Sequence, residues 1–308
     1  MEDTTQKQPT PTRTFRRKTV IIGIAAILAV VGVSVAAIVT YTIHNSPQKI
    51  LTDSIVNSIG VEKSTYTISY TKASGETGLK SATLKGSYEK NKGYAADAAA
   101  SFGQGDYQVA VKGKVALDRS AKAYYIYETV DDGQIVNQAY RMNADTQQAV
   151  QDNFKAKWTV TSIDTIGQGS SCVVGLLQKA QNDPSLVRTL MQAMTVSNAV
   201  DIHTDSSSLD SAVYSVKAAS GTFVDALKDT KQYTQVKDCD AGATEAVASG
   251  LKSAVFRFDV DTKQRQIKKI DVDLKEGAGT SKVTVQITPD SKAEVTIPKD
   301  AKPVQTVQ

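Results

Sequence analysis

The chain has 308 residues, of which 41% are hydrophobic and 22% are charged, and this composition excludes wholesale disorder. Two cysteines and two histidines are too few for a zinc or iron–sulfur centre built from those residue types, and we expect no cofactor. Residues 19–308 carry 31 basic and 30 acidic side chains, a near-neutral balance that argues against nucleic-acid binding as the main function.

An uncharged apolar segment follows the basic start of the chain. Residues 19–43 form a run of 25 residues without a charge, and about 20 apolar residues suffice to cross the hydrocarbon core of a membrane. Four basic residues between positions 13 and 18 precede this run, so the positive-inside rule keeps the N-terminus in the cytosol. The expected organisation of this single-pass cell-membrane protein is a cytoplasmic basic tail (1–18), a transmembrane signal-anchor helix (19–43), a linker (44–49) and an extracytoplasmic domain (50–308).

A cleaved secretory signal is the alternative for this N-terminal segment. The small residues Ser34, Ala36 and Ala37 fit the preference of a signal peptidase. The apolar run continues to Ile43, however, and is longer than the usual signal core of about 7 to 15 residues. Both interpretations place the remaining residues outside the cell membrane.

The expected location outside the cell membrane bears on the oxidation state of Cys172 and Cys239. Thiols outside the cytosol tend to be oxidised, and two cysteines are the smallest number that can pair. We therefore expect a disulfide between them. The alternative is two buried, reduced cysteines in separate helices. A redox centre is not expected, because the sequence has no CxxC spacing.

The first part of the outer domain is predicted to be one helix followed by a meander of strands. Apolar residues recur at helical spacing from Ile50 to Ile59, and the helix is expected to end near Gly60. The period then changes to two, which is typical of antiparallel strands with one buried face. The expected strands lie around Tyr66–Tyr70, Ala82–Tyr88, Tyr94–Phe102, Tyr107–Leu117 and Ala123–Val130.

The middle of the chain is predicted to be mainly helical. The extended residues Trp158–Ser162 precede a helix from Cys172 to Ala180. Asp183 and Pro184 form the start signal of a further helix. The apolar stripe of that helix includes Leu186, Leu190 and Met194. The weaker predictions are helices at 144–154, 223–227 and 244–251 and a short strand at 212–216.

Alternation is clearest at the C-terminal end. Strands are expected around Phe256–Val260, Ile270–Leu274, Val283–Ile287 and Val295–Ile297, with turns between them. Strands first, helices in the middle and strands last predict an α+β fold. We expect a curved antiparallel β-sheet, a half-barrel, with helices packed on its concave face and one transmembrane helix before it.

This order of elements resembles the LolA/LppX/LprG family of envelope lipid-binding domains. The resemblance spans residues 50–304 and consists of pattern and a few phrases. It rests on the helix at 50–59, the tyrosine-bearing meander, KWTVTS at 157–162, FDVDTKQRQIKKIDVDL at 258–274 and VTIPKDAKPV at 295–304. The resemblance implies a half-barrel whose mouth is plugged by helices, and binding of a lipid. Many family members carry a lipidated cysteine, whereas this chain has an apolar span in its place, which favours a tethered binder over a shuttle.

Three groups of polar residues are candidate sites of chemistry. His203 lies between Asp201 and Asp205 in DIHTDSSSLD, but no GxSxG elbow is present, and such a polar run is typical of a surface loop. Asp238 and Asp240 flank Cys239 without the framework of a calcium loop, and solvated acids explain them better. The other acids are the pairs Asp259/Asp261 and Asp271/Asp273, whose strand parity predicts charge pairing on the outer face. We therefore expect no catalytic residue, no metal site and no enzyme activity.

Tyrosines interleaved with alanines on the strand faces suggest a binding cavity, because aromatics with small neighbours can line a hollow. The residues expected to line it are Tyr66, Tyr70, Leu84, Tyr88, Tyr107, Val109, Tyr125, Tyr127, Leu186, Leu190 and Met194. The expected function is non-catalytic binding of a lipid, an acylated molecule or another apolar ligand. The alternative is an envelope scaffold or protein-interaction domain whose interior is filled by its own side chains.

Overall fold

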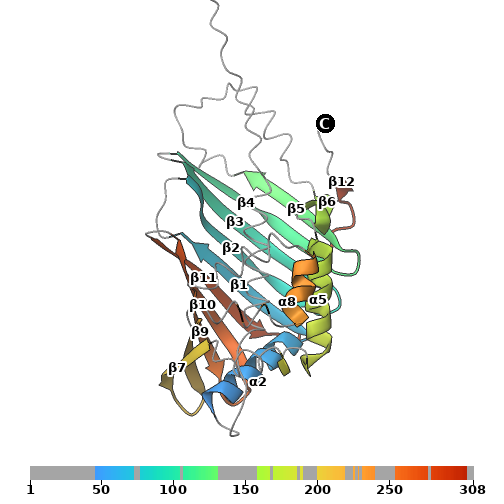
Figure 1. Ribbon diagram of the computed structural model, residues 1–308. Helices are drawn as coiled ribbons and strands as arrows, with labels where there is room; N and C mark the ends of the chain where they lie inside the picture. The colour runs from blue at the N-terminus through green and yellow to red at the C-terminus, as the bar shows by residue number, and fades with distance from the viewer. Residues whose placement is uncertain are drawn as a thin grey trace, which may run out of the picture.

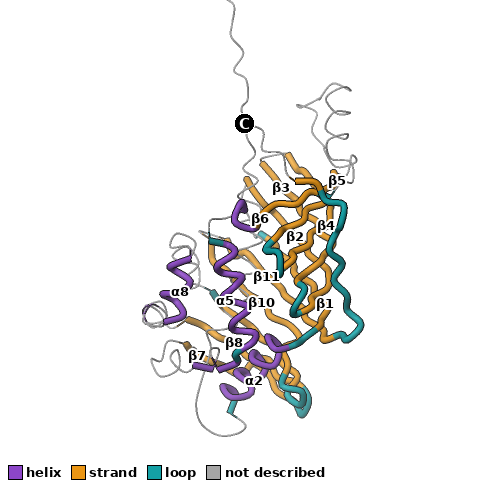
Figure 2. Tube along the Cα trace, turned by 90° about the vertical axis from the view of Figure 1, so that its right-hand side faces the viewer, coloured by secondary structure: helices purple, strands orange, loops and turns teal. Residues whose placement is uncertain are grey.

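A computed structural model describes the chain in segments that together cover most of residues 46–303. The described residues are 46–72, 77–104, 107–130, 158–166, 169–185, 188–189, 200–218, 225, 228, 231–239, 254–276 and 279–303. In these residues twelve strands form one large, open, mixed sheet, and the few helices lie on one of its faces (Figures 1 and 2). The predicted cytoplasmic tail and membrane span, and the helices expected at 144–154 and 244–251, lie outside the described residues.

The elements follow a strand, helix, strand order along the chain. The helices are α2 (Pro47–Gly60), α4 (Ile163–Ile166), α5 (Ser170–Asn182) and α8 (Lys231–Cys239). The strands are β1 (Lys63–Thr71), β2 (Thr77–Glu89), β3 (Gly93–Gln104), β4 (Tyr107–Asp118), β5 (Ala123–Val130), β6 (Thr159–Ser162), β7 (Val200–Ser207), β8 (Ser211–Ala218), β9 (Val255–Asp261), β10 (Gln266–Glu276), β11 (Gly279–Pro289) and β12 (Lys302–Pro303).

The sheet is built from two meanders that meet in its middle. Its strand order is β12-β6-β5-β4-β3-β2-β1-β11-β10-β9-β8-β7. All neighbouring pairs are antiparallel except β12 and β6, which are parallel. The contact between β1 and β11, with Ile68 opposite Val285, joins the first and the last long strand of the sheet. The fold therefore depends on pairing between residues more than 200 positions apart, as Figure 1 shows by the blue strand beside the red one.

Apolar and polar residues alternate along the strands and give the sheet two different faces. We call the face covered by α2, α5 and α8 the inner face, and the opposite one the outer face. Burial alternates residue by residue along β9, where Phe256, Phe258 and Val260 are buried. The inner face beside α2 is a closed apolar core. It contains Leu51, Ile55, Ile68, Leu84, Tyr214, Val216, Phe256, Phe258, Val260, Ile267, Ile270, Val272, Val283 and Val285.

Local sequence explains where α2 begins and which side it buries. Ser46 caps the helix, because its Oγ accepts a hydrogen bond from the Lys49 backbone N–H at 3.2 Å. Pro47 follows at the first position of the helix, where its missing N–H costs nothing. Leu51 and Ile55, one turn apart, are fully buried against the sheet. The predicted helix at 50–59 is confirmed.

Asp53 fastens α2 to two other parts of the molecule. Its carboxylate lies 2.7 Å from Lys49 Nζ, 2.9 Å from Arg188 Nη1 and 3.2 Å from Arg265 Nη1. Burial by itself would raise the pKa of Asp53, but hydrogen bonds and charge from Lys49 and Arg188 outweigh it and hold this pKa below its usual value. The three cations come from α2, from the chain after α5 and from the β9–β10 turn.

We expect Asp53→Asn to lower the free energy of unfolding at pH 7 by about 1–2 kcal/mol, because each of its ion pairs uses a cation that is partly exposed to solvent and so contributes little. A carboxyl with a lowered pKa stabilises the folded state above its unfolded pKa of about 3.9, and this contribution is lost as pH falls through the folded value. The difference between the two proteins should therefore be complete at pH 7 and shrink below about pH 4. Urea unfolding at several pH values checks this, and a difference that grows in acid would contradict it.

Several predicted strands are confirmed and some predictions are wrong. The strands of both meanders lie where alternation placed them, and the short strand at 212–216 is part of β8. The run containing His203 is not a surface loop, because it forms the edge strand β7. No strand forms at 295–297, although Val295 is fully buried, and the last strand is Lys302–Pro303. Sequence interpretation also missed α8, whose nine residues are mostly polar.

The two acids of β10 make charge pairs on the outer face, as expected. Asp271 lies 2.7 Å from Lys269 Nζ and accepts a hydrogen bond from Thr284 Oγ1 at 2.6 Å. Asp273 pairs with Arg257 Nη1 at 2.6 Å. Although burial alone would raise the pKa of Asp271, the bonds from Lys269 and Thr284 lower it. These carboxylates are fixed by cations and need no reaction to explain them.

No helix within the described residues is long and apolar enough to cross a membrane.

Candidate functional site

The candidate site is the inner face of β1 to β5, which adjoins the core that α2 covers and shares Leu84 and Ala96 with it. Backbone register places Tyr66, Tyr70, Leu84 and Tyr88 together on this face, because Leu84 opposes Ile68 and Tyr88 opposes Ser64. Leu84 and Tyr88 are buried, and Tyr66 and Tyr70 pack against the core from its margin. Four of the expected lining residues therefore share one face.

Small residues continue this face across β3. Ala96, Ala98 and Ala100 oppose Gly86, Leu84 and Ala82 of β2 on one side. On the other side Ala98 opposes Gly113 of β4. Ala98, Ala100 and Phe102 are only half-buried, in contrast to the closed core under α2. The result is an apolar strip of small side chains on the inner face, continuous with the core.

Three tyrosines close one end of this strip. The rings of Tyr88 and Tyr94 lie 4.8 Å apart, and those of Tyr66 and Tyr94 meet edge to face at 6.1 Å. Burial raises the pKa of Tyr88 to about 12 and also raises the pKa values of Tyr66 and Tyr94. All three phenols are therefore protonated and neutral at physiological pH.

Arg119 lies beside these tyrosines and connects them to α5. It follows the last residue of β4, and its side chain is buried with 4% exposure. Its Nη1 donates hydrogen bonds to Tyr88 Oη at 3.3 Å, to the Lys90 carbonyl at 3.2 Å and to Gln181 Oε1 at 2.5 Å. Because Gln181 is in the last turn of α5, Arg119 fixes the end of that helix on the sheet. Sequence interpretation missed Arg119, since a single arginine in a turn carries no motif.

A close backbone approach holds this end of the site together. The backbone N–H of Arg119 donates to the Lys92 carbonyl at 3.1 Å, which links the β4–β5 turn to the β2–β3 turn. Gly93 stands between them with φ of 137°, and a Cβ there would lie 1.8 Å from the Leu117 carbonyl oxygen. Only glycine fits this position.

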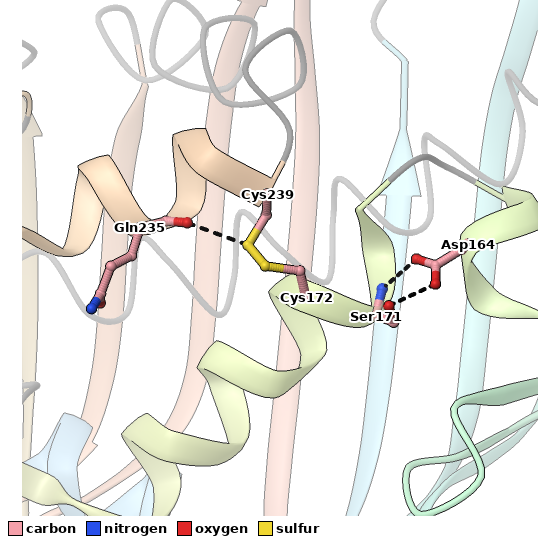
Figure 3. The surroundings of a disulfide bond; sticks show 5 residues. All are labelled: Asp164, Ser171, Cys172, Gln235 and Cys239. Carbon is pink, nitrogen blue, oxygen red and sulfur yellow. Dashed lines mark hydrogen bonds between the residues drawn. A yellow bond between two sulfur atoms is a disulfide. The ribbon is translucent and has the colours of Figure 1, made fainter.

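A disulfide anchors the helices that cover the inner face. Cys172 in the first turn of α5 is bonded to Cys239 at the end of α8, with Cα atoms 5.6 Å apart (Figure 3). This confirms the predicted pair. Asp164 of α4 caps α5, because it accepts hydrogen bonds from Ser171 N at 2.8 Å and Ser171 Oγ at 2.6 Å. These bonds lower the pKa of Asp164. Both ends of α5 are thus fastened.

The other expected lining residues are placed differently or not at all. Across neighbouring strands Tyr125 is in register with Ala116, Ala95, Ser87 and Thr65 in turn. Thr65 is adjacent to the inner-face residue Tyr66 in β1, so Thr65 and Tyr125 both belong to the outer face. The prediction that it shares a face with Tyr66 is wrong, because one position of strand parity inverts the assignment. Of Tyr107, Val109 and Tyr127 the structure describes the backbone, which pairs with Gln104, Phe102 and Lys114. Leu186, Leu190 and Met194 lie outside the described residues.

A depression on the outer face was not expected. It has a volume of about 370 Å³ and lies over β2, β3 and β4. Its lining residues are Thr83, Lys85, Asp97, Ala98, Ala99, Lys112, Gly113 and Lys114. Lys114 and Asp97 lie 3.9 Å apart, and both side chains are more than half exposed. The depression is open to solvent and carries these exposed charged side chains at its margin, so it does not enclose a ligand.

The polar residues of β7 do not form catalytic machinery. Ser215 of β8 donates a short hydrogen bond to Asp205, and His203 stands opposite Ser215 in the register. A serine nucleophile needs its hydroxyl bonded to the base, whereas here the hydroxyl is held by the carboxylate. Within the described residues no group of three His, Cys, Asp or Glu side chains is arranged to hold a metal ion.

Comparisons with known proteins add no assignment: no protein-family model matches the chain, and a search of curated proteins finds no significant match.

Proposed function

We propose that this protein is a membrane-tethered, extracytoplasmic binding protein for a lipid or another apolar ligand, and that it catalyses no reaction. In this proposal the β1–β5 part of the sheet forms the concave wall of a half-barrel, and the ligand lies between its inner face and the helices. The N-terminal apolar segment holds the protein in the cell membrane, and the resemblance to the LolA/LppX/LprG family supports this assignment.

The observation that carries the proposal is the contrast between the two halves of the inner face. Beside α2 large side chains such as Phe258 and Ile270 fill the interior completely. Across β3 the same face carries alanines at 96, 98 and 100, of which two are half-buried. Each methylene placed on such a strip contributes about 0.8 kcal/mol, so a sixteen-carbon tail gains on the order of 12 kcal/mol before ordering costs.

A filled scaffold is the second candidate function. The packing of Tyr66, Tyr88 and Tyr94 against one another favours it, because these rings fill part of the inner face with the chain's own side chains. The two candidates differ in one respect that can be measured, namely whether an apolar molecule binds with a defined stoichiometry.

Ala98→Phe tests the location of the ligand. A ring at this inner-face position should cover two to three methylenes of bound tail and weaken binding by about 10- to 50-fold. The measurement is a titration of the purified full chain, in a neutral detergent, with the fluorescent apolar probe N-phenyl-1-naphthylamine.

The matched control is Ala99→Phe, one residue away and on the outer face, where Ala99 opposes Thr83 and Lys112. It should leave the affinity of the probe within about 2-fold of the original protein, because the added ring lies in the open depression of the outer face, on the other side of the sheet from the proposed site. Equal loss in both variants would contradict an inner-face site. Absence of saturable probe binding, together with no lipid in organic extracts of the purified protein, would favour the scaffold.

A further inference from the structure

Arg119 carries a buried charge that no described neighbour balances with a full negative charge. The three acceptors of its Nη1 are a phenol, a backbone carbonyl and a side-chain amide, and all of them are neutral. Among the residues that the structure describes, no carboxylate forms an ion pair with Arg119. A buried cation without a counter-ion is costly, because burial removes the water that solvates it.

The charge is only partly offset by the end of α5. Gln181 lies in the last turn of this helix, where unpaired carbonyls concentrate partial negative charge. This partial charge falls short of the full anion that a guanidinium normally meets when it is buried. Tyr88 and Tyr94 do not supply one either, since burial keeps both phenols protonated.

The hydrogen bonds of Arg119 are also incomplete on one side. Nη1 makes all three of its bonds, whereas Nη2 and Nε bond to no residue in the described segments. A guanidinium is a planar fork of five N–H donors that matches a carboxylate or phosphate with two parallel bonds. Buried polar groups are almost always satisfied, so these donors, on a residue with 4% exposure, suit an oxyanion that accepts from both.

This cationic group stands at the end of the apolar strip. Tyr88 and Tyr94 separate Arg119 from Ala96, and the strip then continues along β3 to Phe102. Six strand positions at about 3.3 Å each make the strip roughly 20 Å long. The hydrocarbon core of a bilayer is roughly 30 Å thick, and one acyl chain fills about half of that depth. The strip is therefore slightly longer than the depth that one acyl chain fills. Charge at one end and an apolar strip of this length together fit an amphiphile.

We propose that Arg119 binds the oxyanion head group, a carboxylate or a phosphate, of an acyl ligand whose tail lies on the inner face of β3. This inference rests on the proposed function, because it assigns the ligand class of the same site. The anion balances the buried charge and takes the free fork of the guanidinium. The class of ligand is therefore an anionic single-chain or phosphorylated lipid, and a neutral lipid such as an alcohol or ester is bound less tightly.

Matched amphiphiles test the head-group assignment on the unaltered full chain. Hexadecanoic acid, hexadecyl phosphate and hexadecan-1-ol are compared in displacing N-phenyl-1-naphthylamine in a neutral detergent at pH 8. A charge-assisted bidentate contact should make either anion about 10- to 100-fold more effective than the alcohol. Inorganic phosphate and acetate serve as head groups without tails, and they should not displace the probe.

The outcomes separate this inference from the proposed function. Equal displacement by acid, phosphate and alcohol overturns the role of Arg119 and leaves apolar binding intact. Failure of the probe and of all three amphiphiles to bind overturns the proposed function and the inference with it. If inorganic phosphate displaces the probe as strongly as hexadecyl phosphate does, the assignment of an amphiphile is overturned. Such a result indicates a site for a free anion.

Arg119→Met supplies the residue-level test. It should abolish the preference for the anions while the alcohol binds as before, because methionine keeps the apolar volume and removes the fork. Lys92→Met is the control, since Lys92 is an exposed cation in the adjoining turn, and it should keep the full preference. A preference that survives in Arg119→Met overturns the assignment. If this variant does not fold, the comparison of amphiphiles on the original protein still decides.

Discussion

Phe258→Ala is expected to lower the free energy of unfolding by about 3–5 kcal/mol, the usual range for a fully buried phenylalanine. Phe258 is the largest fully buried side chain of the described core, with 0% exposure. It lies between Tyr214 and Ile270 in the register, and its ring stacks at 6.3 Å on that of Phe256. Alanine would leave a cavity that these neighbours, held by strands on both sides, cannot close.

Urea unfolding followed by the fluorescence of Trp158, the single tryptophan, measures this loss. Asp259→Ala is the matched control, because Asp259 is the next residue along β9 and belongs to the outer face. It should change stability by less than about 1 kcal/mol. A loss at position 258 no larger than that at 259 would contradict the placement of the core beside α2.

Removal of the disulfide has the second large expected effect. The bond between Cys172 and Cys239 closes a loop with a sequence separation of 67 residues. On the chain-entropy model such a cross-link stabilises by about 4 kcal/mol, because it restricts the unfolded chain. The double variant Cys172→Ser with Cys239→Ser should lose about this amount in urea unfolding. Because α5 also holds Gln181 against Arg119, the variant should lose part of any ligand affinity as well.

The original protein treated with dithiothreitol serves as the reference for this variant. Reduced protein and the double variant should unfold at the same urea concentration, and the reductant should have no effect on the variant. Peptide mapping without reductant gives an independent check. Cysteines that react with an alkylating agent before reduction would contradict the bond.

Much of the sheet was predictable, because each strand of the two meanders buries one face only. Tyr66, Ile68 and Tyr70 alternate with hydroxyl residues, and Phe256, Phe258 and Val260 alternate with charged ones. Such alternation predicts both the strand and the face that the strand buries. The helix α2 and the disulfide were predictable for equally local reasons, namely helical spacing and the presence of two cysteines in the chain.

Other elements were not predictable, because alternation reports burial and strand formation requires a partner. The 200–207 run is too polar to resemble a strand, yet it pairs with β8 at the edge of the sheet, where one side faces solvent. Val295 has the alternation of a strand and is fully buried, but no strand forms there. Tyr125 was assigned to the wrong face, since parity in β5 depends on its register with Ala116.

Some residues of the candidate site were likewise predictable from the sequence, and others were not. Tyrosines and alanines on alternating positions indicated an apolar strip, and the register of β1 to β3 places Tyr66, Leu84 and Ala98 on one face. Arg119 gave no signal, because a single arginine in a turn is usually solvated. Arg119 is buried because the β2–β3 and β4–β5 turns contact each other and because the end of α5 packs beside Tyr88 and Tyr94.

The sequence by itself determined most strands of the two meanders, the buried face of strands such as β1 and β9, and the pair of cysteines, because these depend on periodicity and composition within short segments. The tertiary structure decided the pairing of β1 with β11, the edge position of β7 and the enclosure of Arg119. These features depend on contacts between residues far apart in the chain, whose geometry no local pattern encodes. Burial of a charge is a property of its surroundings, and here the surroundings are assembled only when β2, β4 and α5 meet.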